Sequence, residues 1–522
     1  MTSARRLQSG GLIDRSRRIR FKFNGREYFG HPGDTLASAL LAQGVRLFGR
    51  SFKYHRPRGV IGAGAEEPNA LVQVGEGAYS TPNLKATQVE LYEGLTARTV
   101  NGWPSLAFDI GAINNRLSRL LPAGFYYKTF MWPKSAWMRY EHHIRHAAGL
   151  GHTPSLPDPD QYDKRHAHCD VLVVGAGPTG LIAALGAARS GARVMLVDEQ
   201  SRLGGSLLAA PAIIGGQAGL DWASEVEAEL RSLPEVTILS RSTVTGYYDH
   251  NFLSVNERRT DHLGPVPFDT PITRERLWRI RAKQVVLATG AIERPLVFDG
   301  NDTPGVMLAS AVNAYIHRYA VAPGRSGAVF TNNDSGYQAA IDMTNAGMEV
   351  RAVVDVRVKA GADVSSAVAD LGIPVYLGHV VPSVQSGLQG LKRIELAKLS
   401  ADGRDILSHK GLVDCQILAV SGGWSPVVHL HSQSGGRPCY QEGQACFIPG
   451  ASVQDERSAG ACAGSFSLAA CLQEGADAGV SAAAQSGWPG GYVDVPVAAE
   501  RVEAALQPLW EVPAGALAGD RV

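Results

Sequence analysis

The period of the hydrophobic positions changes along the chain, and these changes divide it into segments of different predicted structure. Between Ile19 and Tyr28, apolar and polar residues alternate around Asn24-Gly25, which predicts a β-hairpin with a tight turn. The stretch Asp34–Leu41 begins like a capped helix, because polar residues precede an apolar run. A hairpin followed by a helix predicts a β-grasp, ferredoxin-like unit over residues 1–110.

This first unit lacks the ligands of an iron–sulfur cluster. A ferredoxin of this type needs four cysteines in the loop after the helix, and residues 51–71 contain none. Gly62-Ala63-Gly64-Ala65-Glu66-Glu67-Pro68-Asn69 stands there instead. We therefore expect a structural unit without a cluster, followed by a linker with helical segments over residues 111–167.

A short β-branched run begins the strongest motif of the chain. Val171–Val174 predicts a buried parallel strand, and it leads into Gly175-Ala176-Gly177-Pro178-Thr179-Gly180, which matches GxGxxG. A helical stretch follows from Leu181 to Ser190. Gly175 permits the tight turn, Gly177 lets backbone amides approach a pyrophosphate, and Gly180 allows the helix to pack closely on the strand. This order predicts a Rossmann-type dinucleotide site.

The following strand supports the same prediction. Arg193–Val197 ends at Asp198-Glu199, about 20 residues beyond the glycines, where an acid binds the ribose hydroxyls. Carboxylates at this position repel a 2′-phosphate, which disfavours NADP. The pattern leaves NAD and FAD open, because both offer an adenosine ribose and a pyrophosphate.

Two later segments extend this first dinucleotide domain, which we place at residues 168–322. Leu203–Leu207 is a glycine-rich loop that includes Gly205 and Ser206, and Val285–Ala291 is a strand that ends in a small-residue turn at Thr289-Gly290. The pair resembles flavoprotein disulfide-reductase-like folds. That resemblance implies a second nucleotide-binding-like domain inserted after the turn, here at residues 323–410.

The inserted domain repeats the topology without the glycines. Gly327–Phe330 and Glu349–Asp355 predict its strands, with a helix around Tyr337–Asn345. Its turn, Thr331–Gly336, carries bulky polar side chains that would crowd a pyrophosphate. We expect this second site to be empty and structural.

The chain is then expected to return to the first domain over residues 411–485. Gln416–Val420 and Ala445–Ala451 predict strands, and Ala459–Gly464 precedes a helix that extends to Glu474. Small residues here suit a helix N-terminus that faces a cofactor, and tight packing alone would also select them. Residues 486–522 form a C-terminal tail.

Composition excludes several classes of partner. Lys plus Arg total 50 against 49 for Asp plus Glu, so no broad field favours nucleic acid or an anionic membrane. Charges from Asp14 to Arg18 break any apolar export signal after Arg5-Arg6, and no stretch reaches the roughly 18 apolar residues of a membrane span. We expect a cytoplasmic protein.

No residue pattern identifies a catalytic or metal centre. The six cysteines form no CxxC pair, which is typical of structural thiols. His142 and His146 share a predicted helix face without a third ligand nearby. We therefore name no catalytic residue.

Several long motifs carry a more specific resemblance. They are Leu47–Gly59, Glu67–Leu71, Ala123–Pro133, Ala288–Leu296 with Asn301–Met307, and Val420–Pro426. On these motifs the chain resembles the N-terminal half of the alpha subunit of bacterial heterotetrameric sarcosine oxidase.

The resemblance implies NAD in the glycine-turn site, with FAD and FMN mainly on the beta subunit, and gamma and delta subunits as further partners. Carried over by motif, the implied NAD contacts are Thr179, Asp198, Glu199, Gln200, Ser206, Val244, Ala461, Phe466 and Leu468. The implied activity is oxidative demethylation of sarcosine to glycine, with hydrogen peroxide formation and one-carbon transfer to tetrahydrofolate.

The C-terminal domain, the substrate and the class of protein need separate consideration. The family's alpha subunit continues into a folate-binding domain, whereas this sequence stops at Asp520-Arg521-Val522, so we expect that domain to be absent here. The substrate is sarcosine or another secondary amine. The alternatives are a free-standing FAD-dependent reductase, which would favour a second intact fingerprint, and a non-catalytic assembly subunit, which would tolerate loss of Asp198 and the glycines.

Overall fold

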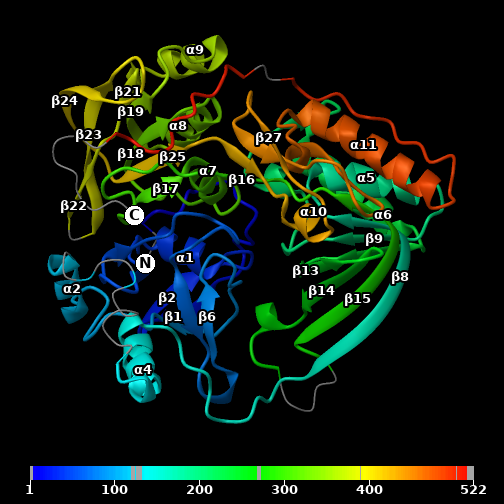
Figure 1. The fold of residues 1–522 in the computed structure, drawn as a ribbon, viewed down its shortest axis with the longest axis horizontal. Coiled ribbons are helices and arrows are strands. Elements are labelled where there is room, and N and C mark those ends of the chain that lie inside the picture. Colours follow the sequence, from blue (N-terminus) through cyan, green and yellow to red (C-terminus); the bar gives the residue numbers. More distant parts are fainter. Residues whose placement is uncertain are drawn as a thin grey trace.

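The computed structural model describes residues 4–118, 121, 124, 132–266, 272–387, 389–500 and 503–513. Most of the Ala123–Pro133 motif and the terminal residues 514–522 lie outside this part of the chain. Figure 1 shows a β-grasp unit in blue, a first dinucleotide-type unit built on the long strands β8 and β15, and a second such unit around β18.

The β-grasp unit has the predicted hairpin and capped helix. β1 (Ile19–Phe23) pairs with β2 (Arg26–Gly30) across a turn in which Asn24 and Gly25 both have positive φ. Helix α1 (Leu36–Ala42) starts at the N-cap Thr35, whose side chain forms a reciprocal capping box with Ser38. The mixed sheet has the order β2-β1-β7-β5-β6. Its other elements are β3 (Gly49–Arg50), β4 (Pro57–Arg58), β5 (Leu71–Val74), β6 (Thr81–Lys85) and β7 (Thr96–Arg98).

The first dinucleotide-type unit is one sheet of order β12-β9-β8-β15-β14-β13, with β29 paired to β15. Strands β12, β9, β8, β15 and β29 run parallel, so their carboxyl ends meet at one edge. The elements are β8 (Tyr162–Val174), α5 (Pro178–Ala188), β9 (Val194–Val197), α6 (Gly219–Ser232), β12 (Val236–Leu239), β13 (Ser242–Tyr248), β14 (Phe252–Arg258), β15 (Glu275–Leu287) and β29 (Glu456–Ser458).

Three predicted elements of this unit differ in the structure. Strand β8 already begins at Tyr162, inside the predicted linker, because its exposed polar half pairs with the equally long β15. The predicted strand Ala445–Ala451 is only β28 (Cys446–Ile448), which pairs with β27 (Cys439–Gln441), and the short polar β29 joins the main sheet instead. The last helix, α11 (Leu468–Gln485), extends beyond the predicted end at Glu474.

The second dinucleotide-type unit is a parallel sheet of order β17-β25-β18-β19-β20. It comprises β17 (Val306–Leu308), α7 (Ala309–His317), β18 (Ser326–Thr331), α8 (Ser335–Asn345), β19 (Glu349–Asp355), α9 (Ala362–Asp370), β20 (Val375–Leu377) and β25 (Ile417–Ser421). Strands β16 (Ala291–Glu293) and β26 (Trp424–Pro426) pair where the chain crosses between the two units.

The remaining elements lie around these sheets. They are α2 (Ile113–Arg116), α4 (Trp137–Ala148), β10 (Ile213–Ile214), β11 (Gln217–Ala218), β21 (His379–Val380), β22 (Val384–Gly387), β23 (Gly390–Leu399), β24 (Ile406–Asp414) and α10 (His429–Gln433).

The β-grasp unit and the second unit share one hydrophobic core. Buried residues of β1 and α1 belong to the same cluster as Val312 and Tyr315 of α7 and Ile417 of β25. Burial of this apolar area fixes the β-grasp unit to the rest of the molecule. The predicted fold class, an α/β dinucleotide-binding fold with an inserted second unit and a preceding β-grasp unit, is confirmed. None of the described helices combines the length and apolarity that a bilayer crossing requires.

Candidate dinucleotide-binding site

The glycine turn between β8 and α5 has the geometry that its residue types predict. Gly175 has φ +99°, and a Cβ there would lie 2.3 Å from the Ala288 carbonyl oxygen. A Cβ on Gly180 would lie 1.8 Å from the Gly175 carbonyl oxygen. At Gly177, in contrast, the nearest atom to a Cβ would be the Gly205 Cα at 3.9 Å. Gly175 and Gly180 are therefore needed by the fold. At Gly177 a side chain would meet only an ordinary van der Waals contact within the protein, so glycine there suits the close approach of a pyrophosphate to the N-terminus of α5.

The acid after β9 is bound to this turn. Asp198 accepts hydrogen bonds from the Ala176 amide at 2.7 Å and the Gln200 amide at 2.8 Å, one on each carboxylate oxygen. A carboxylate has about four acceptor positions, so each oxygen can still accept a ribose hydroxyl. Burial raises the pKa of Asp198, against the lowering effect of the two amides and Arg318.

The neighbouring predicted residues lie around the same edge. Gly205 and Ser206 are in the 3₁₀ turn η5 (Gly205–Leu208), and the Gly204 amide donates to the Ala176 carbonyl at 2.8 Å. Val244 lies in β13, whose first residue, Ser242, donates its amide to the Asp198 carbonyl at 2.8 Å. The structure thus brings the Asp198–Gln200 segment, η5 and the start of β13 together.

Thr289 and Gly290 lie at the carboxyl end of β15, on the other side of the turn. The Thr289 hydroxyl donates to the Val427 carbonyl at 2.9 Å, and the Val427 amide donates to the Gly290 carbonyl at 3.0 Å. These bonds fix the end of β15. This strand end lies beside the glycine turn, since a Cβ on Gly175 would lie 3.4 Å from the Thr289 Cα.

The late segment packs on α5 through small residues. Ala461 is in η7 (Gly460–Ala463), and a Cβ on Gly460 would lie 2.2 Å from the Thr179 hydroxyl oxygen. Glu474 holds this turn by accepting from the Gly460 amide at 2.7 Å and from the Ser465 hydroxyl. Phe466 is half-buried between η7 and α11, and Leu468 packs at the edge of the α5–α11 core. Of the two explanations for these small residues, tight packing is directly visible here.

The second turn is filled by its own side chains. Asn332, Asn333 and Asp334 are all buried. The Asn333 amide group donates to the Ser421 carbonyl and hydroxyl, and Asp334 accepts from Arg357 at 2.7 Å. Arg357 also binds Asp355, at the end of the next strand, at 2.7 Å.

Residues 503–513, which we call the strap, cross this second turn. The Asn332 side chain donates to the Gln507 and Leu509 carbonyls, and the Ala504 amide donates to Asp334 at 2.7 Å. In Figure 1 the red end of the chain runs from α11 back to the second unit. Protein atoms therefore occupy the position that a pyrophosphate takes in an intact site.

The β-grasp loop without cysteines is organised by a carboxylate. Glu67 is fully buried and accepts from the amides of Ile61, Gly62, Asn69 and Ala70 at 2.6–3.2 Å. Burial of the side chain raises the pKa of Glu67 in spite of these four donors. Hydrogen bonds to Glu67 thus hold together a loop in which ferredoxins bind a cluster.

Sequence reasoning missed the charged residues that other elements bring to the ribose end. The Arg318 guanidinium, just after α7, donates to the Gln200 side chain, and Arg258 of β14 donates to the Glu199 carbonyl at 3.1 Å. Neither contact is local in sequence, so no pattern signals it.

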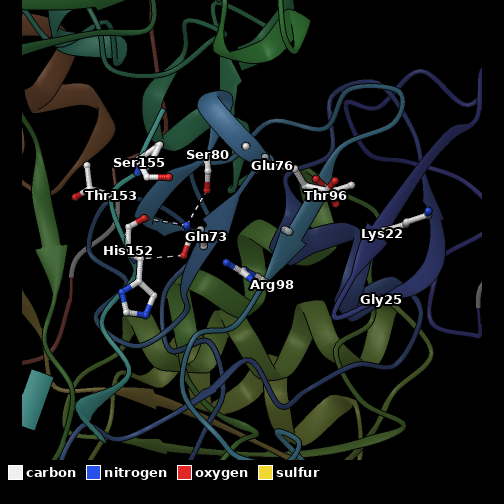
Figure 2. Close-up of a pocket in the computed structure, with 14 residues that line it drawn as sticks. Lys22, Gly25, Gln73, Glu76, Ser80, Thr96, Arg98, His152, Thr153 and Ser155 are labelled. Atoms are coloured by element: carbon white, nitrogen blue, oxygen red, sulfur yellow. Dashed lines mark hydrogen bonds between the residues drawn. The ribbon is translucent and has the colours of Figure 1, made fainter. Parts of the chain in front are cut away.

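A separate cleft of about 440 Å³ lies on the β-grasp unit and is lined by none of the predicted site residues. Figure 2 shows Gln73 among the lining residues, donating to Ser80 at 2.7 Å and to the His152 carbonyl at 3.0 Å. These bonds attach the linker to the sheet.

Comparison with known proteins agrees with this architecture. Residues 16–102 match the model of the 2Fe-2S iron-sulfur cluster binding domain, and residues 170–260 match that of the FAD dependent oxidoreductases. L-proline dehydrogenase from P. horikoshii has a similar fold, with a TM-score of 0.60 and 19% identity over 93% of this chain and 76% of that chain. Fold and turn thus define an α/β protein of the class with two dinucleotide-type units, the first of which matches the FAD dependent oxidoreductases.

Within this class the chain is related, along nearly its whole length, to sarcosine oxidase alpha subunits. It is 49% identical to "Sarcosine oxidase subunit alpha" of Rhizobium meliloti and 39% identical to that of Corynebacterium sp. strain P-1, in each case over 98% of this chain. It spans 50% and 48% of those two proteins, about half the length of the curated relatives it matches. The predicted resemblance is confirmed.

Proposed function

We propose that this chain is the nucleotide-binding alpha component of a sarcosine oxidase-like complex and that it binds NAD at the Gly175–Gly180 turn. The observation that carries this proposal is the 49% identity over 98% of the chain, which includes the open turn. Gly177, Pro178 and Thr179 would hold the pyrophosphate, Asp198, Glu199 and Gln200 the ribose, and Ser206, Val244, Thr289, Gly290, Ala461, Phe466 and Leu468 would line the rest.

In this proposal the amine chemistry belongs to the complex and not to this chain alone. A beta subunit would carry FAD and FMN, and gamma and delta subunits would complete the assembly. A flavin would supply the acceptor for the two electrons removed from sarcosine, and dioxygen would take these electrons to give hydrogen peroxide. The other products are glycine and a one-carbon unit, which is passed to tetrahydrofolate. The residues of this chain bind and orient a nucleotide.

A second candidate is FAD in the same turn. The match of residues 170–260 to the FAD dependent oxidoreductases favours it, and FAD presents the same adenosine diphosphate to Gly177 and Asp198. The domain boundaries proposed from the sequence are the same under either cofactor.

An analysis of bound nucleotide distinguishes these two candidates. The purified chain is heated, and the nucleotide that it releases is identified by chromatography and absorbance. NAD without flavin supports the main proposal, and stoichiometric FAD supports the second. A chain with no nucleotide that also fails to bind added NAD or FAD contradicts both. Sarcosine-dependent peroxide formation after addition of a flavin-bearing beta subunit tests the complex.

A further inference from the structure

The loop of the β-grasp unit holds one carboxylate in a fixed position. Glu66 accepts from the amides of Ala63 at 2.6 Å and Gly64 at 2.9 Å, both on Oε1. A Cβ on Gly62 or Gly64 would lie 2.4 Å or 2.7 Å from the Glu66 carboxylate oxygens. The loop therefore has glycines where the Glu66 side chain folds back, and Oε2 is left for other contacts.

This loop faces the first dinucleotide-type unit. Helix α7 and the residue after it connect this loop to the end of β9: the Tyr315 hydroxyl donates to the Gly62 carbonyl at 3.0 Å, and Arg318 donates to the Gln200 side chain. Burial raises the pKa of Glu199, and the carboxylates of Asp198 and Glu66 raise it further. Nearby, Arg241 at the start of β13 binds Glu90 of the β-grasp unit through two bonds of 2.6 Å and 2.8 Å. The bidentate pair fixes the β-grasp unit against the edge where the ribose is expected.

Glu66 Oε2 and the Glu199 carboxylate are hydrogen-bond acceptors at this edge. Among the residues that the structure describes, none donates a hydrogen bond to Glu66 Oε2 or to the Glu199 carboxylate. The neighbouring cations donate elsewhere: Lys85 to the Ala65 carbonyl, Arg258 to the Glu199 carbonyl and Arg318 to Gln200. Adjacent carboxylates repel each other, and a ligand that donates hydroxyl groups relieves this repulsion.

We propose that Glu66 is a specificity-determining residue of the nucleotide site, so that the adenosine ribose lies between Glu199 of one unit and Glu66 of the other. The inference rests on the proposed dinucleotide binding. The vicinal hydroxyls of an unphosphorylated ribose donate to both carboxylates in charge-assisted hydrogen bonds. A 2′-phosphate would place a dianion against the same acids, so the β-grasp loop, which contains no cysteine, selects NAD against NADP.

Titration of the nucleotide-free full chain with NAD and NADP tests this proposal, with Glu66→Gln as the variant. The glutamine oxygen can still accept from Ala63 and Gly64, but the negative charge is lost. We expect the NAD dissociation constant to rise about tenfold, as for loss of a hydrogen bond to a charged acceptor. The ratio of the NADP to the NAD dissociation constant should also fall, because one of the charges that repels the 2′-phosphate is gone. The control is Glu76→Gln, an exposed acid of the same unit in the separate cleft of Figure 2, which should change neither constant.

Glu66→Asp keeps the negative charge and shortens the reach, so it should weaken NAD while NADP stays excluded. Thermal unfolding of each variant shows whether the fold is retained. If the wild-type chain binds NAD and Glu66→Gln binds both nucleotides like wild type, the role of Glu66 is overturned. If the wild-type chain binds no dinucleotide, the proposed function itself fails.

Discussion

The two dinucleotide-type units share a strand–turn–helix topology and differ in what fills the turn. In the first unit a Cβ on Gly177 would have no neighbour nearer than 3.9 Å, whereas in the second unit Asn332 and Asp334 are buried and bound to the strap. The same backbone path thus leaves the turn free of bulky side chains in one unit and forms a packing junction in the other. Topology alone therefore predicts no ligand, since the turn's side chains decide it.

Breaking the packing junction should have the largest effect on stability. Arg357→Met leaves the buried Asp334 and Asp355 without their cation, which should lower the free energy of unfolding by about 3–5 kcal/mol. Chemical denaturation measures this. The control is Arg351→Met in β19, the strand that ends at Asp355, where Arg351 forms an exposed pair with Glu349. Nucleotide affinity of the folded variant should not change. A loss equal to that of the control would contradict the structural role of the second turn.

The crossing between the two units carries a pH-dependent group. Burial raises the pKa of Glu293 to about 7, although its carboxylate accepts from the Ser310 amide at 2.7 Å. Above pH 4.5, the ordinary value of the group, the unfolded chain releases this proton while the folded chain keeps it, so stability falls until about pH 7.

Glu293→Gln removes this dependence. The unfolding free energy of the variant minus that of wild type should therefore be about 3 kcal/mol more favourable at pH 8 than at pH 4. Denaturation curves at both pH values measure the difference between variant and wild type. Equal differences at the two pH values would show that Glu293 titrates alike in the folded and unfolded chains.

The glycines of the first turn separate fold from binding. Gly180→Ala would place a Cβ 1.8 Å from the Gly175 carbonyl oxygen, and we expect a loss of about 2 kcal/mol from overpacking. A Cβ on Gly186 of the same helix would have two side-chain methyl groups as its nearest neighbours, at 3.2 Å, and a backbone oxygen at 3.7 Å. Gly186→Ala should therefore change stability by less than about 1 kcal/mol. Denaturation of the two variants compares them directly, and similar stabilities would argue against the close approach of α5 to the turn.

Gly177→Ala should have the smallest effect on the fold and a clear effect on binding. Gly177 has φ −72° and ψ −176°, which alanine also adopts, so stability should change by no more than about 1 kcal/mol. Its methyl group enters the space left for the pyrophosphate, and the NAD dissociation constant should rise at least about tenfold. Unchanged affinity would place the nucleotide elsewhere.

The sequence predicted local features well and long-range ones poorly. The Gly175–Gly180 turn and the Asn24-Gly25 hairpin depend on neighbouring residues, and both were predicted. The strap was predicted only as a tail, since its bonds to Asn332 join residues far apart in the chain. The strand predicted at Ala445–Ala451 followed the apolar pair Phe447-Ile448, whereas the polar β29, stabilised by pairing with β15, gave no hydrophobic pattern.

The most direct test of one open and one closed unit is the number of nucleotides that the chain binds. Calorimetric titration of the nucleotide-free chain should show that one equivalent of NAD binds per chain. Gly177→Ala should abolish or strongly weaken this binding, whereas an exposed substitution such as Arg351→Met should leave it unchanged. Two equivalents per chain would contradict the closed second turn, and one equivalent that Gly177→Ala leaves intact would contradict the open first turn.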